Sequence, residues 1–273
     1  MLERIVSDAP VFLFVAVRCF ATIMTLPLFS SRTVPRTAKI ALAGYMAFFI
    51  FPQISLADGI FSSYKSYISP EGNFSLEYLL LLAGEAMIGI ILGFFVQIIF
   101  ASFSTAGQFF AFQMGLSASE VYDSLSQVEN PLMGQFFNFM AMLVFLQNNW
   151  LQMLLLKGMS ESFKVISAIS IVDNSRFFAE FMMKSLTLLF KDALIIALPV
   201  MASLFLINVT VGILSKAAPQ MNLLSEGFPV LMLTAYFLIF VLVPQFIEFF
   251  EGCFKGGLFE IEKLLIGLKG GGQ

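Results

Sequence analysis

The chain consists of long apolar runs joined by shorter polar segments. The runs cover residues 11–29, 38–56, 79–116, 132–156, 193–214 and 229–250. A helix needs about 20 apolar residues to cross the hydrocarbon core of a bilayer. In lipid every backbone polar group must be paired inside the protein, and a helix achieves this within one segment. The pattern therefore predicts an all-α membrane protein.

Composition supports this interpretation. Of the 273 residues, 59% are hydrophobic, 34 are phenylalanine and only 12% are charged, whereas charged residues make up about 25% of a soluble domain. Lipid or partner helices must cover so much apolar surface. The net charge of −3 lacks the basic excess that a nucleic-acid partner requires.

The chain offers little for catalysis or metal binding. It contains no histidine, which excludes Ser-His-Asp and Cys-His nucleophile pairs and every His-ligated metal site. A Walker-type phosphate loop is also absent from the sequence. Cys19 lies in an apolar run far from Cys253, so we expect a small core residue and no disulfide. We therefore predict a protein without catalytic residues, metal or cofactor.

The distribution of charge predicts a topology. The segment between the first two runs carries Arg32, Arg36 and Lys39 and no acid, which places it in the cytoplasm by the positive-inside rule and the N-terminus outside. The first run is too long for the apolar region of a signal peptide and has no small-residue cleavage site, so we expect it to stay in the mature protein. Residues 58–77 carry three acids against one lysine, which suits the outside.

The run at 79–116 conflicts with this topology. As one helix its 38 residues would extend about 57 Å, nearly twice the hydrocarbon core of about 30 Å. A single span would place the acidic segment 117–131 inside and the more basic segment 157–176 outside, both against the charge rule. A hairpin that enters and returns removes both conflicts, and we favour it over the single span. It would line a cavity or a subunit interface, with its bend among Ser102, Ser104, Thr105 and Gly107.

The C-terminal third predicts an antiparallel two-helix hairpin. Residues 176–191 are amphipathic and lead into the run at 193–214, which a polar turn at 216–227 joins to the last run. The charged tail from Glu251 ends in three glycines, and we expect it to be frayed. We place a domain boundary near residue 176.

Several residues are candidates for function. Arg18 and Glu85 lie inside apolar runs, where a charge indicates a functional site. We favour a structural role instead, either as a buried pair or as side chains that snorkel to the membrane surface. Small residues let helices approach closely in lipid, and three glycines stripe the third run: Gly84, Gly89 and Gly93.

The end of the third run combines small, amide, aromatic and Met side chains. Apolar constrictions gate water by dewetting, and Met adapts to irregular gaps, but composition alone favours a packed helix end. The residues of this candidate gate are Gly107, Phe109, Phe110, Phe112, Gln113, Met114, Gly115 and Leu116. Helix-breaking residues bracket the last turn, namely Pro219 and Gln220 on one side and Gly227 and Pro229 on the other.

The order of these motifs over about residues 10–245 resembles the FliR family of flagellar export proteins, which includes the equivalent subunit of virulence injectisomes. The matching residues are Arg18, Pro27, Val34, Pro35 and Lys39, then Thr105-Ala106-Gly107 with Gln113-Met114-Gly115-Leu116, then Ala218-Pro219-Gln220 with Gly227-Phe228-Pro229. Two departures stand out. Asp123 is followed by Ser124 where the family often has Asp-Pro, and Asn148-Asn149-Trp150 stands where it often has Gly-His.

The resemblance implies a subunit of the flagellar type III protein-export gate in the bacterial inner membrane, within the flagellar basal body. Residues 1–176 would be FliP-like and residues 177–273 FliQ-like. One copy would complete a helical ring of FliP subunits with FliQ outside and FlhB nearby, and unfolded export substrates would pass through. The stretch after Gln113-Met114-Gly115, to Asp123, would form part of the plug that closes the channel. The alternatives are a secondary transporter for a small solute, for which we find no inverted repeat, and the equivalent injectisome subunit.

Overall fold

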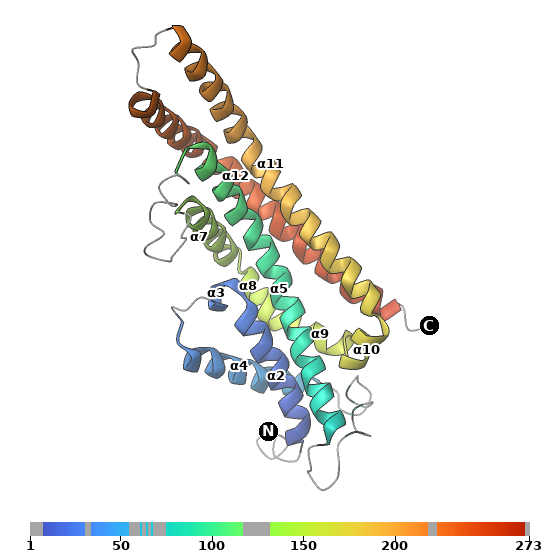
Figure 1. Cartoon of the computed structure of the whole chain (residues 1–273). Helices are drawn as coiled ribbons and strands as arrows, with labels where there is room; N and C mark the ends of the chain where they lie inside the picture. The colour runs from blue at the N-terminus through green and yellow to red at the C-terminus, as the bar shows by residue number, and fades with distance from the viewer. Residues whose placement is uncertain are drawn as a thin grey trace. The chain divides into compact units, whose positions relative to one another are not determined.

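The described part of the chain is helical throughout. The computed structural model describes residues 8–30, 34–54, 61, 64, 67, 75–116, 132–217 and 223–270, and within them every regular element is a helix. Three helices are long and apolar enough to cross a membrane, and a bent helix pair would make a fourth (Figure 1). The predicted all-α membrane protein is confirmed.

The chain forms two compact units that alternate along the sequence. The first comprises Met1–Ile98, Leu146–Ser185 and Gly256–Gln273, and the second comprises Ile99–Phe145 and Leu186–Lys255. Three long helices contribute to both units. The domain boundary predicted near residue 176 separates parts that would resemble different proteins. The division into compact units does not test that boundary, so it stays a prediction.

The first unit begins with short helices. Helix α2 covers Ala9–Thr25, α3 covers Pro27–Ser30, and α4 covers Arg36–Ile50 and packs against α2. A 3-10 turn, η1, follows at Phe51–Gln53. The 15 residues of α4 rise only about 22 Å, so the expected full-length span at 38–56 is wrong. The proline at position 52 lies in η1, where its ring is compatible with the start of a new turn but not with continuation of α4.

Helix α5 covers Leu76–Gln113 and is unbroken over 38 residues, so the predicted hairpin in this run is wrong. The polar residues expected to bend it are accommodated within the helix. Ser102 Oγ donates to the carbonyl of Ile99 at 2.7 Å, which is a standard way for a helix to satisfy a hydroxyl in apolar surroundings. Gly107 serves a close helix contact instead of a bend. The hairpin was expected to place the acidic segment 117–131 outside the membrane. That segment lies outside the described residues.

The predicted helix at 132–156 is interrupted. Helix α7 covers Leu132–Gln147, followed by α8 at Trp150–Gln152, the π-helical segment η4 at Met153–Gly158, α9 at Met159–Val165 and α10 at Ala168–Asp173. At the first break Asn149 adopts a φ of 57°, a left-handed conformation that Asn tolerates better than most residues. A capping box between Ser167 and Ser170 starts α10.

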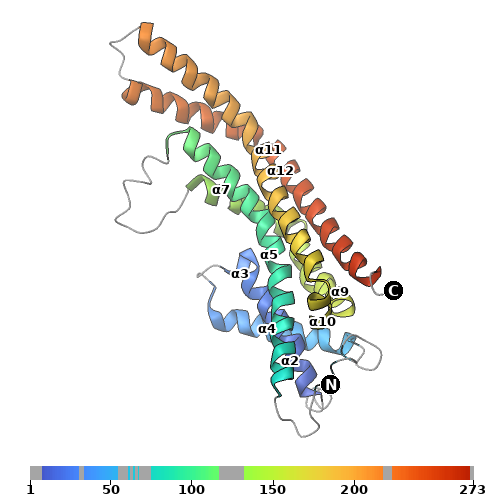
Figure 2. The ribbon, with the colours of Figure 1, turned by 45° about the vertical axis from the view of Figure 1, so that its right-hand side comes forward.

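The C-terminal part forms the predicted antiparallel hairpin. Helices α11 (Ser175–Ala217) and α12 (Leu223–Gly270) run side by side in both ribbon views (Figures 1 and 2). Lys184 Nζ lies 3.0 Å from Glu260 Oε2, and Cys253 Sγ lies 3.7 Å from Asp192 Oδ2. As the position on α11 rises, its partner on α12 falls, which defines an antiparallel pair.

Two expectations about this hairpin are corrected. The segment from Glu251 continues α12 as far as Gly270, where we expected a frayed tail. Gly227 and Pro229 lie inside α12 and not in the turn. Pro229 is the seventh residue of α12, past the first turn, so its ring removes one intrahelical hydrogen bond. Pro219 and Gln220 lie outside the described residues.

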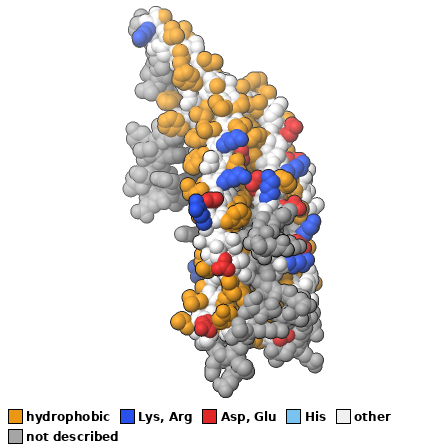
Figure 3. All heavy atoms as spheres, turned by 90° about the vertical axis from the view of Figure 1, so that its right-hand side faces the viewer, with side chains coloured by type: hydrophobic (Ala, Val, Ile, Leu, Met, Phe, Trp, Pro, Cys, Tyr) orange, Lys and Arg blue, Asp and Glu red, His pale blue; other side chains and the backbone are white. Residues whose placement is uncertain are grey.

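The hairpin has an apolar and a charged portion. Figure 3 shows charged side chains gathered in a band, with hydrophobic side chains dominating toward the α11–α12 connection. The two helices of the hairpin carry ion pairs of Lys184 with Glu260, Lys255 with Glu251, and Lys263 with Glu260. Toward the connection, large apolar side chains are exposed on both helices: Leu198, Phe205, Leu206, Ile213, Leu233, Phe237 and Phe240.

Candidate functional site

The two charges predicted to lie in apolar runs form a buried pair in the first unit. Arg18 Nε of α2 lies 2.6 Å from Glu85 Oε2 of α5, and both side chains are 0% exposed. The hydroxyl of Tyr64 donates to the other carboxylate oxygen, Glu85 Oε1, at 2.8 Å. Glu85 therefore accepts one hydrogen bond on each oxygen, which offsets the cost of burying its charge.

The same cluster holds the break between α9 and α10. Arg18 Nη2 donates to the carbonyl of Ile166 at 2.7 Å, and the amide of Ala168 donates to the Tyr64 hydroxyl at 2.6 Å. At a helix break such backbone groups lose their regular partners. The guanidinium also lies 4.2 Å from the centre of the Phe163 ring, a favourable cation–π distance. The cluster thus joins α2, α5, Tyr64 and the α9–α10 break.

Tyr64 was missed by the sequence analysis. The only signal was an aromatic residue at every third position, Phe61, Tyr64 and Tyr67, in a segment that we took for a polar connection. Burial, and then the nearby Glu85 carboxylate, raise the pKa of Tyr64 well above its usual range. The phenol therefore stays protonated and keeps donating to Glu85, as a structural cluster requires.

The glycine stripe of α5 faces other helices of the same unit. A Cβ on Gly89 would lie 2.5 Å from the Arg18 carbonyl and 2.8 Å from Ala21 Cβ, and one on Gly93 would overlap the Thr25 side chain. A Cβ on Gly84 would lie 2.5 Å from Ala168 Cβ on α10. These positions bring backbones together beside the ion pair, as expected of small residues in packed membrane helices.

The Gln-Met-Gly-Leu motif forms the C-terminal cap of α5. Gly115 has a φ of +78°, a conformation that favours glycine. The amide of Leu116 donates to the carbonyl of Ala111 at 2.9 Å, and that of Gly115 to the carbonyl of Phe112 at 3.1 Å. This is the Schellman pattern. The motif therefore ends the helix and sets the direction in which the chain leaves it.

The described candidate gate residues lie in the second unit and differ in exposure. Phe110 and Met114 are fully buried, Phe109, Gln113 and Leu116 are half-buried, and Phe112 is 73% exposed. A Cβ on Gly107 would lie 2.5 Å from the Met133 carbonyl of α7, so this glycine serves close packing. Asp123 lies outside the described residues. Among these three phenylalanines only Phe112 has a largely exposed side chain, so only its ring could line a passage.

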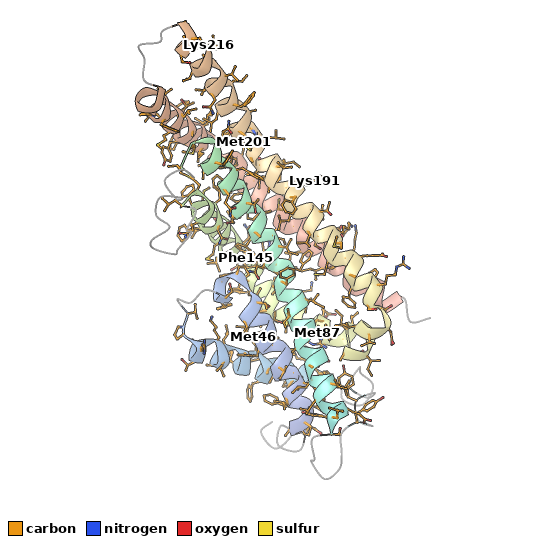
Figure 4. All side chains as sticks on the ribbon, viewed as in Figure 1. Met46, Met87, Phe145, Lys191, Met201 and Lys216 are labelled. Carbon is orange, nitrogen blue, oxygen red and sulfur yellow. The ribbon has the colours of Figure 1, made fainter. Side chains whose placement is uncertain are left out.

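Phenylalanine rings hold the end of α5 in place. Phe103 packs on Phe250 at 4.2 Å between ring centres, and Phe110 packs on Phe137 at 4.9 Å. The cluster draws on α5, α7 and α12; Figure 4 labels one member, Phe145, among Phe100, Phe103, Phe110, Phe137, Phe145, Phe246, Phe250 and Phe254. The buried residues of the motif therefore pack the end of α5, as expected for a packed helix end.

Two motifs far apart in sequence meet at this cap. A Cβ on Gly115 would overlap Cε1 of Phe228 and would lie 2.8 Å from its Cδ1. Phe228 belongs to the Gly-Phe-Pro motif of α12. Both motifs stand out in the sequence, but nothing in the sequence connects them.

Little in this unit points to other chemistry. Cys253 donates to Asp192 at 3.7 Å, and both it and Cys19 of the first unit are free thiols. Within the described ranges no group of three or more His, Cys, Asp or Glu side chains could hold a metal ion.

Comparison with known proteins places the chain. Residues 9–257 match the model of the family described as bacterial export proteins, family 1. The chain belongs to this family. It is 33% identical to the flagellar biosynthetic protein FliR of Bacillus subtilis (strain 168), with 88% of each chain covered. It is 30% identical to the protein of the same name from Escherichia coli (strain K12), with 93% of this chain and 92% of the relative covered.

A third relative carries a different name. The surface presentation of antigens protein SpaR of Shigella sonnei is 30% identical over 68% of this chain and 70% of its own length. The region shared with the bacterial export proteins includes the ion-pair cluster and the cap of α5, together with nearly all of the α11–α12 hairpin.

Proposed function

We propose that the protein is a subunit of the flagellar type III protein-export gate in the bacterial inner membrane, within the flagellar basal body. The observation that carries this proposal is the match to flagellar biosynthetic proteins over about nine-tenths of both chains. The match to SpaR covers about two-thirds of each chain, which favours a flagellar system over an injectisome.

Partner subunits are needed because the exposed apolar surface is longer than a bilayer is thick. On α11, exposed apolar side chains extend from Phe177 to Leu214, about 56 Å of helix against a hydrocarbon core of about 30 Å. Lipid cannot cover all of it. We assign the remainder to FliP, FliQ and FlhB, with the FliP-like part at residues 1–176 and the FliQ-like hairpin at 177–273.

The end of α5 is proposed to help close the channel to ions when no unfolded substrate is passing. Phe112 is the exposed apolar side chain that can contribute to a constriction from which water is excluded. Met114, which we also expected to seal the passage, is buried and holds the helix end in place. The resemblance to FliR implies that the plug continues toward Asp123, which lies outside the described residues. The protein shapes and closes a conduit and carries out no chemical step itself.

Deleting the gene should abolish motility, and a tagged copy should restore it and purify with other export-gate subunits. Expressed alone, the chain should give little monodisperse protein in detergent, because its apolar faces lack their partners. Swimming assays, pull-down and size-exclusion chromatography measure these outcomes. A well-folded solitary monomer would favour the transporter alternative. Intact motility with lost secretion of virulence proteins would favour the injectisome.

Phe112→Ala should leave the complex assembled but leaky to ions, because it removes an exposed apolar ring without disturbing the core. Phe110→Ala is the matched control: its ring is fully buried, and losing it costs about 3–5 kcal/mol, so yield should fall. Ion leak and complex yield are measured in the same cells. Normal yield of the Phe112 variant with no leak would refute the gate role.

A further inference from the structure

Two separate features of the structure favour glycine at position 115. The positive φ alone would also admit Asn, which occurs at such helix ends. The ring of Phe228 lies against the same glycine, and a Cβ on Gly115 would overlap its Cε1 and displace it. The cap of α5 is therefore built to receive this one ring from α12.

The ring of Phe228 is carried by the start of α12, which contacts α11. Gly227 is buried, and a Cβ there would lie 3.5 Å from Val211 Cγ1 of α11. Pro229 follows, and its own ring fixes its φ. Gly227 and Pro229 thus flank the ring closely, so a displacement of the start of α12 carries the ring of Phe228 away from the cap.

A second contact with α12 differs in kind. Phe110, one helical turn before the cap, faces Phe246 at 6.1 Å between ring centres. That contact belongs to the phenylalanine core and stabilises the second unit as a whole. The contact of Phe228 with Gly115 instead lies on the residue whose φ redirects the chain.

We propose that Phe228 is a positioning residue for the gate. By docking on Gly115 it ties the cap of α5 to the α11–α12 hairpin, so that partner binding to the exposed hairpin faces is transmitted to the gate. This inference rests on the proposed function of the α5 end. It adds a regulatory connection: a hairpin held in place keeps the cap in its closed orientation, and a displaced hairpin releases it.

Phe228→Ala, introduced into the whole complex, should leave complex yield within about twofold of wild type and raise ion leak several-fold, because the core of the second unit is retained. Phe228→Leu should leak less, because it keeps an apolar contact. Phe249→Ala is the matched control: Phe249 is also half-buried on α12, and its loss should not cause a leak. A leak equal to that of the Phe228 variant would show that general loosening of α12 is responsible.

Gly115→Asn supplies the complementary test, because Asn tolerates the positive φ while its Cβ displaces the ring from the other side. If the two positions act through one contact, Gly115→Asn with Phe228→Ala should leak no more than the leakier single variant. Gly252→Ala, where a Cβ meets nothing within 4 Å, should behave as wild type. Additive leaks from the two sites would overturn the proposal.

The Phe112→Ala variant distinguishes a failure of the proposed gate role of the α5 end from a failure of the positioning role of Phe228. If it leaks while Phe228→Ala stays closed at normal yield, the gate stands and the positioning role is wrong. If neither leaks, both are wrong. If Phe228→Ala fails to assemble, Phe228→Leu decides: a leak at normal yield supports the proposal, and a closed complex at normal yield overturns it.

Discussion

Glu85→Ala should prevent stable accumulation of the chain. The substitution leaves the Arg18 guanidinium fully buried without its carboxylate and removes the acceptor of the Tyr64 hydroxyl. Breaking one side of a buried ion pair costs about 3–5 kcal/mol, a large part of a typical domain stability of about 5–15 kcal/mol. The α9–α10 break depends on the same cluster, so the loss should extend to the packing of α10. Fluorescence-detected size-exclusion chromatography of the complex measures the surviving fraction.

Two comparison variants make this result specific. Glu180→Ala removes an ion pair with Arg176 whose side chains are 67% and 93% exposed, and it should leave yield unchanged because exposed pairs contribute little. Glu85→Gln with Arg18→Met should recover part of the yield lost in Glu85→Ala, because no unpaired buried charge remains. Normal yield of Glu85→Ala would mean that the pair is not needed to hold α2 against α5.

Gly89→Ala should reduce folded protein strongly, whereas Gly44→Ala should have no effect or a small favourable one. At Gly89 the new methyl would lie 2.5 Å from the Arg18 carbonyl and 3.0 Å from the Thr22 amide nitrogen. These are backbone atoms of α2, so the helices must separate, at a cost of about 1–3 kcal/mol for overpacking. At Gly44 a Cβ meets nothing within 4 Å, and Ala in a helix is favoured over Gly by about 0.5–1 kcal/mol.

The opposite signs of the two glycine variants are the test. Thermal unfolding in detergent, followed at equal protein concentration, compares them directly. Equal destabilisation at both positions would show that glycine is needed for backbone conformation generally. Equal tolerance would show that α2 and α5 do not pack as closely as these contacts require.

Elements that are specified by local sequence could be predicted without the structure. The apolar runs predicted membrane-compatible helices, and the polar turn predicted the hairpin of α11 and α12. Arg18 and Glu85 stood out because charges in apolar runs are costly. The resemblance to the export family came from short ordered motifs, and the family match over residues 9–257 confirmed it.

Element boundaries were less predictable because opposing local effects compete. Apolar character continues across Phe51 and across Asn148–Asn149, yet the helices end there. Conversely, Ser102 suggested a bend in α5, but its hydroxyl bonds to a carbonyl one turn earlier and the helix continues. Charge distribution favoured a hairpin in this run, but it carries no information about whether a particular helix is straight.

The sequence by itself determined that this protein is helical, membrane-compatible and poor in catalytic groups, because backbone pairing in lipid and the cost of buried charge depend on composition and local order. Only the tertiary structure decided which side chains meet. In a helix that is apolar on every side, such as α5, periodicity does not distinguish a face that packs on protein from one that faces lipid. The burial of Met114 beside exposed Phe112, the insertion of Tyr64 between Glu85 and Ala168, and the docking of Phe228 on Gly115 were therefore decided by shape and hydrogen bonding between distant segments.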